Sequence, residues 1–177
     1  MPKPFTLDPA LKLDELAACH EDTESSVRLY FSPTAPTFTA RFAGEPLEQV
    51  RGKLTLRLNE SDIRSAFATL TSLEARFRVD FDFRCRKRFK DRLSKYFREV
   101  ENSRDRVRLD EDILEGWRRH TDVSVKDISA LRGAFKFRNW FAHGRYYPPN
   151  FGRKYDFDYV YLMVDSIISG FPFLPVP

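Results

Sequence analysis

Cysteine and histidine are scarce in this sequence: its 177 residues include two cysteines and three histidines. Cys19 and Cys85 lie far apart and lack the spacing of metal ligands, so we expect two reduced thiols rather than a disulfide. No His, Asp and Glu cluster has metal-ligand spacing either, and we therefore expect no metal and no other cofactor.

Long apolar runs are also missing. No window approaches the length of apolar chain that a membrane span needs, and the N-terminus lacks the pattern of a signal peptide. We therefore expect a cytoplasmic protein that does not associate with membranes.

Apolar residues are nevertheless frequent enough for a real core, at 42% of the chain with 17 phenylalanines, and the length suits one domain with a short extension.

Charge is unevenly spread along the sequence. Residues 1–60 carry seven Lys/Arg and nine Asp/Glu, a net −2, whereas residues 61–177 carry 23 and 17, a net +6. The positive part favours a polyanionic partner.

Residues 1–60 predict a small β-rich extension. Apolar residues alternate with polar ones in three short segments that Ser-Pro, Ala-Pro and Gly-Glu-Pro separate, which is typical of antiparallel strands. The alternating residues are Val27, Leu29 and Phe31; Phe38, Ala40 and Phe42; and Leu54, Leu56 and Leu58.

Residues 61–177 predict an up-and-down helical bundle, so the fold class is mostly α. Apolar residues at helical spacing indicate long helices over about 61–81, 89–100, 125–143 and 156–170, with an acidic helix start at 110–112. The helix over 125–143 begins at Ser124, with Asp127 completing a capping box, and ends at Gly144, where a left-handed residue is expected.

The end of that helix carries Arg138-Asn139-Trp140-Phe141-Ala142-His143-Gly144. Five residues on an ideal helix separate two side chains by roughly 140° and about 7.5 Å along the axis, so Arg138 and His143 are not a pair on one face. They can border one groove if the helix end unwinds or if a second copy of the helix packs alongside.

These residues resemble the signature of the HEPN superfamily (higher eukaryotes and prokaryotes nucleotide-binding). The resemblance covers about residues 61–170 in helix order and is specific at Arg138, Asn139 and His143. It implies a dimeric bundle and a metal-independent RNA endonuclease of toxin–antitoxin or defence systems, with Arg138 and His143 as the catalytic pair and Asn139 as the polar residue beside them. Arg145 stands where one subgroup with nucleotidyltransferase antitoxins has a tyrosine, so that kind of partner is not implied.

The side chains suit this chemistry. Arginine binds phosphate oxygens and stays charged, and histidine exchanges protons near neutral pH. Arg145 and Tyr146 follow the motif as candidate RNA contacts. Arg86, Lys87 and Lys90 belong to a run of eight basic residues and one acidic residue between Arg84 and Arg98, which is either a phosphate-contacting strip or a solvated helix face.

The sequence thus predicts a metal-independent endoribonuclease for single-stranded or loop RNA, with a composite site at a homodimer interface and a possible antitoxin or defence partner. Two alternatives remain open. One is a non-catalytic HEPN-like module that binds RNA, a nucleotide or a protein; the other is an interaction protein with an accidental motif.

Overall fold

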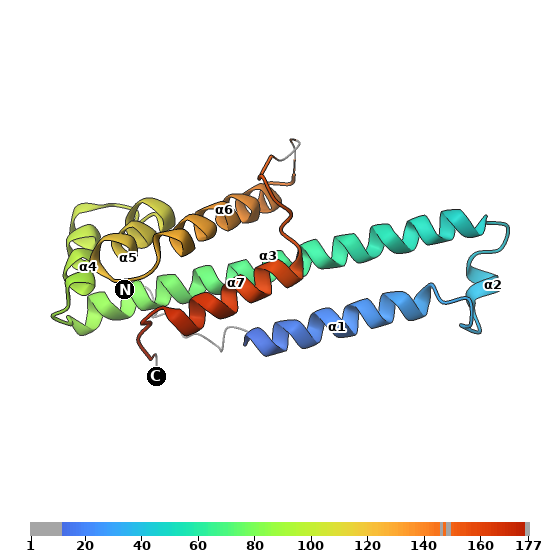
Figure 1. Ribbon diagram of the computed structural model, residues 1–177, viewed down its shortest axis with the longest axis horizontal. Helices are drawn as coiled ribbons and strands as arrows, with labels where there is room; N and C mark the ends of the chain where they lie inside the picture. Colours follow the sequence, from blue (N-terminus) through green and yellow to red (C-terminus); the bar gives the residue numbers. More distant parts are fainter. Residues whose placement is uncertain (1–11, 146, 148–149, 176–177) are drawn as a thin grey trace.

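The computed structural model describes residues 12–145, 147 and 150–175, and no strand occurs among them. Their regular structure is helical, and the fold is a helical bundle (Figure 1). In chain order the elements are α1 (Leu13–Tyr30), α2 (Phe38–Arg41), α3 (Leu47–Lys87), α4 (Arg92–Ser103), the π-helix η1 (Leu109–Leu114), α5 (Glu115–His120), α6 (Val125–Ala142) and α7 (Phe157–Gly170).

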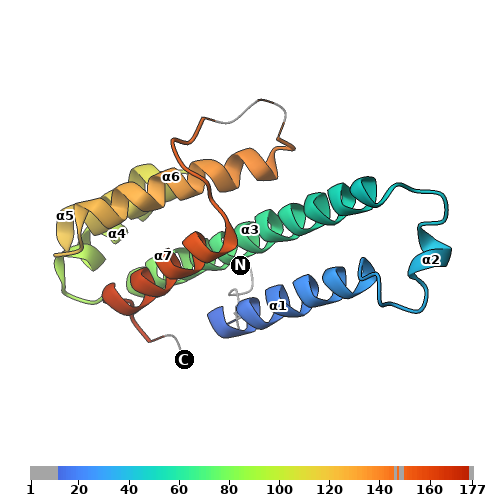
Figure 2. The same ribbon diagram turned by 45° about the vertical axis from the view of Figure 1, so that its right-hand side comes forward.

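Helix α3 is the axis of the bundle. Its 41 residues span about 60 Å at 1.5 Å per residue. Helices α1, α6 and α7 lie beside α3, and α4, η1 and α5 gather at its C-terminal end (Figures 1 and 2). The core therefore forms around the C-terminal half of α3.

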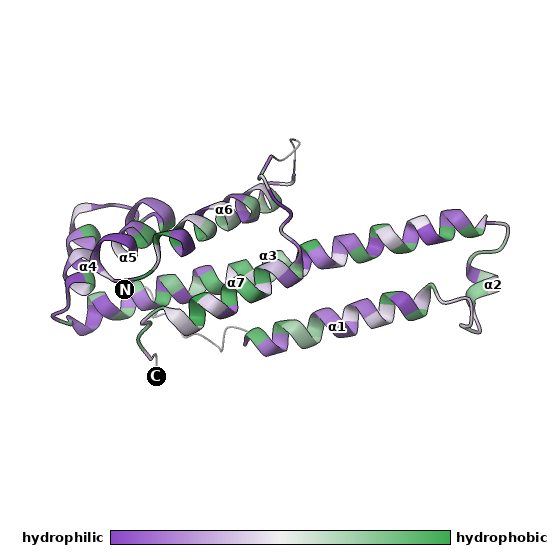
Figure 3. Ribbon diagram, viewed as in Figure 1, coloured by the Kyte–Doolittle hydropathy of each residue, from purple (hydrophilic) through white to green (hydrophobic). Residues whose placement is uncertain are grey.

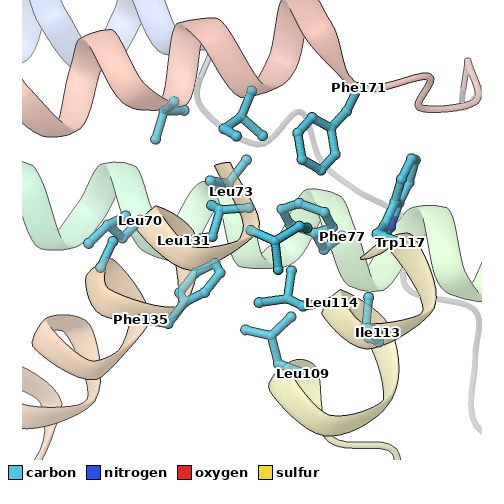
Figure 4. Packing of buried hydrophobic residues seen from close by; sticks show 14 of the residues in the cluster. Leu70, Leu73, Phe77, Leu109, Ile113, Leu114, Trp117, Leu131, Phe135 and Phe171 are labelled. Atoms are coloured by element: carbon cyan, nitrogen blue, oxygen red, sulfur yellow. The ribbon is translucent and has the colours of Figure 1, made fainter. Parts of the chain in front are cut away.

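The core is built from large side chains that several helices direct towards α3. Figure 4 shows Phe77 of α3 among Leu131 of α6, Trp117 of α5 and Phe171 after α7. Phe77, Trp117 and Leu131 have no exposed surface. Helix α7 is largely hydrophobic along its length (Figure 3), as expected for an element that packs against both α3 and α1.

The buried end of the bundle also holds an ion pair that fastens the chain after α7. Arg84 pairs with Asp80 at 2.6 Å, and both are buried. The Arg84 Nη2 donates to the carbonyl of Pro172, and Asp80 accepts from the Leu174 amide. Because these partners satisfy both charges, the pair is tolerated in an apolar surrounding.

The predicted β-rich extension is wrong. Residues 27–58 include the end of α1, the short α2 and the N-terminal part of α3, which together project beyond α6 and α7 as a two-helix arm (Figures 1 and 2). The predicted boundary at residue 60 lies inside α3.

The alternating pattern of these segments is compatible with a helix as well as with a strand. In each triplet the outer two residues are four apart and so share one helix face, as Leu54 and Leu58 do, and the middle residue points outwards. Leu29 and Leu56, the middle residues of two triplets, are each 67% exposed. A sheet would have placed all three members of each triplet on one covered face, whereas here the outer two are less exposed than the middle one.

Most of the other predicted helices are confirmed. The helix predicted over 125–143 is α6, and the last one is α7, capped by Asp156, whose carboxylate accepts from the Tyr159 amide. The helix predicted over 89–100 begins later, at Arg92, because the Asp91 side chain caps it by accepting from the Ser94 amide at 2.9 Å.

Candidate functional site at the C-terminus of α6

Helix α6 ends in a complete hydrogen-bonded cap. Ser124 starts the helix by accepting from the Lys126 amide, and Gly144 ends it with φ +83°, as predicted. The Gly144 amide donates to the Phe141 carbonyl, and the Arg145 amide donates to the Trp140 carbonyl. These are the two bonds of a Schellman motif, so the helix stays regular up to His143. Unwinding therefore does not bring Arg138 and His143 together.

His143 lies on a solvent-open face of α6 together with Lys136 and Asn139. These residues stand at positions i, i+3 and i+7, and all three are exposed. They border a hollow of about 350 Å³ whose remaining lining residues are Trp140, Tyr147, Asn150 and Phe151. A proton-exchanging group, a cation and an amide thus share one concave surface.

Aromatic contacts within the chain hold one wall of this hollow. The Trp140 Nε1 donates to the Tyr147 carbonyl at 2.8 Å, and the Trp140 ring meets Phe151 edge to face at 5.6 Å. Phe141, on the other side of the helix, packs against Phe67 of α3 at 4.8 Å. Both rings are therefore partly covered by their own chain.

Arg138 faces α3 rather than the hollow. Its Nη2 forms an ion pair with Glu74, whose other oxygen accepts from Arg78 at 2.7 Å. The Arg138 side chain is only 19% exposed, and this burial lowers the pKa of its guanidinium. Its Nε is buried without a hydrogen-bond partner among the described residues. The structure therefore separates Arg138 from His143, as the helical spacing predicts.

Arg145 is occupied by Glu60. Its two terminal nitrogens bind the two carboxylate oxygens at 2.9 and 3.0 Å, and its guanidinium lies 4.9 Å from the centre of the Phe141 ring. The hydrogen bond from Arg145 lowers the pKa of Glu60. Arg145 therefore links the end of α6 to α3. Tyr146, the other predicted RNA contact after the motif, lies outside the described residues.

The basic residues Arg86, Lys87 and Lys90 do not join this site. Phe141 contacts Phe67, and α3 runs 20 residues from Phe67 to Lys87, which is about 30 Å along the helix. Arg86 pairs with Asp82 at 2.6 Å, whereas Lys87 and Lys90 are exposed. Arg84, at the start of the same run, is buried in its ion pair. The strip thus lies at the opposite end of the core from His143 (Figure 1).

Lys136 is the charged residue of the hollow that the sequence-based prediction did not include. It stands one turn before Asn139 and two turns before His143, and this spacing was the signal that could have found it. Arg138, the charged residue that the motif contains, lies on the face of α6 directed towards α3 and not on the face with Lys136.

The described residues contain no group of three or more His, Cys, Asp or Glu that could hold a metal ion. Over the same part of the chain, each helix is too short or too polar to cross a lipid bilayer. No family model, curated protein or solved structure matches the chain.

Proposed function

We propose that this protein is an endoribonuclease that cleaves single-stranded or loop RNA without a metal and acts in the cytoplasm as a toxin or defence effector. One observation carries the proposal: His143, Lys136 and Asn139 line one open hollow at the end of α6. Such a surface combines acid–base chemistry with a cation and a hydrogen-bonding amide, which a phosphodiester transfer requires.

In the proposed reaction the RNA 2′-hydroxyl attacks the adjacent phosphorus. The O2′–P bond forms and the P–O5′ bond breaks, which leaves a 2′,3′-cyclic phosphate and a 5′-hydroxyl. His143 accepts the proton of the 2′-hydroxyl, a water molecule donates a proton to the departing O5′, and Lys136 stabilises the charge that develops on the phosphoryl oxygens. Asn139 orients the phosphate by donating from its amide.

Arg138 enters this site only from a second copy of the chain, because in its own chain it binds Glu74 on the other side of α6. A homodimer in which Arg138 of one protomer approaches His143 of its partner supplies both groups to one phosphate. A partner protein of the antitoxin or defence type would then act by covering the hollow.

The test compares three single variants in an RNA cleavage assay with EDTA present. His143→Ala should lower the cleavage rate at least about a hundredfold, and Lys136→Ala about tenfold. Lys126→Ala, which removes an exposed lysine from the other end of α6, is the matched control and should cleave like the wild type. Wild-type cleavage by His143→Ala, or activity that needs added Mg²⁺, would exclude the proposal.

A non-catalytic RNA-binding module is the second candidate, and the Arg138–Glu74 ion pair favours it because that pair gives Arg138 a structural role. In that case the wild-type protein would bind RNA without cleaving it. Lys136→Ala would then weaken binding in a gel-shift assay, and no 2′,3′-cyclic phosphate ends would form.

A further inference from the structure

The turn between α3 and α4 presents a dense group of free cations, which we call the basic knob: Lys87, Arg88, Lys90, Arg92 and Lys95, with Phe89 among them. All six residues are exposed. None of the five cations has an ion-pair partner among the described residues. Two acids near the turn are already engaged, because Asp82 binds Arg86 and Asp91 binds Arg84 and the Ser94 hydroxyl. Glu99, one turn after Lys95 on α4, is a further exposed acid, and the five cations outnumber it. The knob therefore carries an uncompensated positive charge.

The backbone of the knob is held in place. Arg88 adopts a left-handed conformation at φ +53°, which glycine would take with less strain, yet the chain has a cation there. The Arg98 guanidinium donates to the Phe89 carbonyl at 3.0 Å, and the Phe89 ring lies 5.9 Å from that of Phe83. Phe89 is 37% exposed, so its ring contacts Phe83 and still presents accessible surface.

From these observations we propose that the basic knob is a second binding site for single-stranded RNA, separate from the hollow at His143. It holds the sugar–phosphate backbone on its cations while a base stacks on Phe89. An acidic protein is a weaker match, because a salt-bridging surface does not need an exposed aromatic ring at its centre. The inference rests on the proposed function in one respect, namely that the strand held here is the one cleaved at His143.

The separation of the two sites determines the substrate class. About 30 Å of α3 lies between Phe67, beside the motif, and Lys87. A stacked strand covers this distance in roughly nine nucleotides at about 3.4 Å each. Stacked RNAs shorter than this reach one site at a time, and longer single strands reach both. The knob thus selects for long unpaired RNA.

The experiment measures binding, in a His143→Ala background so that no RNA is cut. Fluorescence anisotropy follows unstructured RNAs of about 25 and about five nucleotides over a range of salt concentrations. The knob variant combines Lys87→Glu, Lys90→Glu and Arg92→Glu. The matched control combines Arg51→Glu, Arg57→Glu and Lys126→Glu, which reverses the same number of exposed charges elsewhere. Circular dichroism checks that both variants are folded.

The knob variant should bind the long RNA at least about tenfold more weakly than the control, and its log–log salt slope should be shallower by about two units, since three phosphate contacts are lost. The preference for the long RNA over the short one should shrink at the same time. Equal affinities and slopes for the knob variant and the control would overturn the proposal.

Phe89→Ala separates RNA from an acidic protein as the ligand. It removes the stacking surface and no charge, so it should weaken binding of the long RNA at least about fivefold and leave the affinity for polyglutamate unchanged. Polyglutamate that binds as tightly as RNA would overturn the assignment to RNA. Failure of the ribonuclease proposal looks different, because RNA would then still bind the knob while the wild-type protein cleaves nothing.

Discussion

At the scale of single residues, the ion pair between Arg138 and Glu74 links α6 to α3. Each side chain is less than one-fifth exposed, and Arg138 has a buried Nε without a partner among the described residues. Removing Glu74 would leave a half-buried guanidinium uncompensated, which costs more than loss of a surface pair.

We therefore predict that Glu74→Gln and Arg138→Leu each lower the free energy of unfolding by about 1–2 kcal/mol. The double variant should lose at least about 1 kcal/mol less than the sum, as coupled residues do. Urea denaturation measures these values. Arg78→Ala is the control, because Arg78 binds the same carboxylate from a more exposed position and should cost less than about 0.5 kcal/mol. Strictly additive losses would show that the two residues do not stabilise each other.

At the scale of elements, the continuity of α3 is the feature that most changes the fold relative to the sequence-based prediction. Gly52 lies in the interior of the helical arm, and a Cβ added there would meet no heavy atom within 4 Å. Gly116 has the opposite surroundings at the start of α5, where an added Cβ would lie 2.6 Å from the buried Phe97 ring.

Alanine at these two glycines should consequently have opposite effects. Gly52→Ala should stabilise the protein by up to about 1 kcal/mol, since a helix interior favours alanine over glycine. Gly116→Ala should destabilise it by about 1–3 kcal/mol, because the Phe97 ring has no space to move into. Thermal melts followed by circular dichroism measure both changes. No gain on Gly52→Ala would contradict an exposed helix interior at this position.

At the scale of the whole molecule, the separation of Arg138 from His143 is the observation behind the proposed homodimer. The aromatic rings of the motif do not call for a second copy, because Trp140 packs against Phe151 and Phe141 against Phe67 within the same chain. A second copy is proposed because Arg138 and His143 lie on opposed faces of α6 and the regular helix end does not unwind.

We predict that sedimentation at micromolar concentration gives about twice the 20.8 kDa chain mass. Mixing inactive Arg138→Ala with inactive His143→Ala protein should restore part of the cleavage activity, because the heterodimer keeps one site with both intact side chains. The measurement requires that subunit exchange is first verified. A strict monomer with full activity would contradict the shared site, and absence of recovery in verified heterodimers would show that the four side chains act together or that each site lies within one chain.

The boundaries of α6 and α7 could be read from the sequence, because local hydrogen bonds decide them. Ser124 and Asp156 cap the helix starts, and Gly144 takes the left-handed conformation at a helix end. The divergence of Arg138 and His143 followed from helix geometry alone. These features depend on residues a few positions apart, so no long-range information was needed.

The helical arm and the ion pairs of Arg138 and Arg145 depend on tertiary contacts. The alternating pattern of the arm is compatible with both a strand and a helix. Packing of α3 against α1 favours the helix, in which the outer residues Leu54 and Leu58 are partly covered. Glu74 lies 64 positions before Arg138, and the bidentate bond of Arg145 reaches back to Glu60, so no local pattern marks either ion pair. The physical reason is the range of the forces: caps and turns are satisfied within one or two helical turns, whereas burial and charge pairing depend on which distant segments pack together.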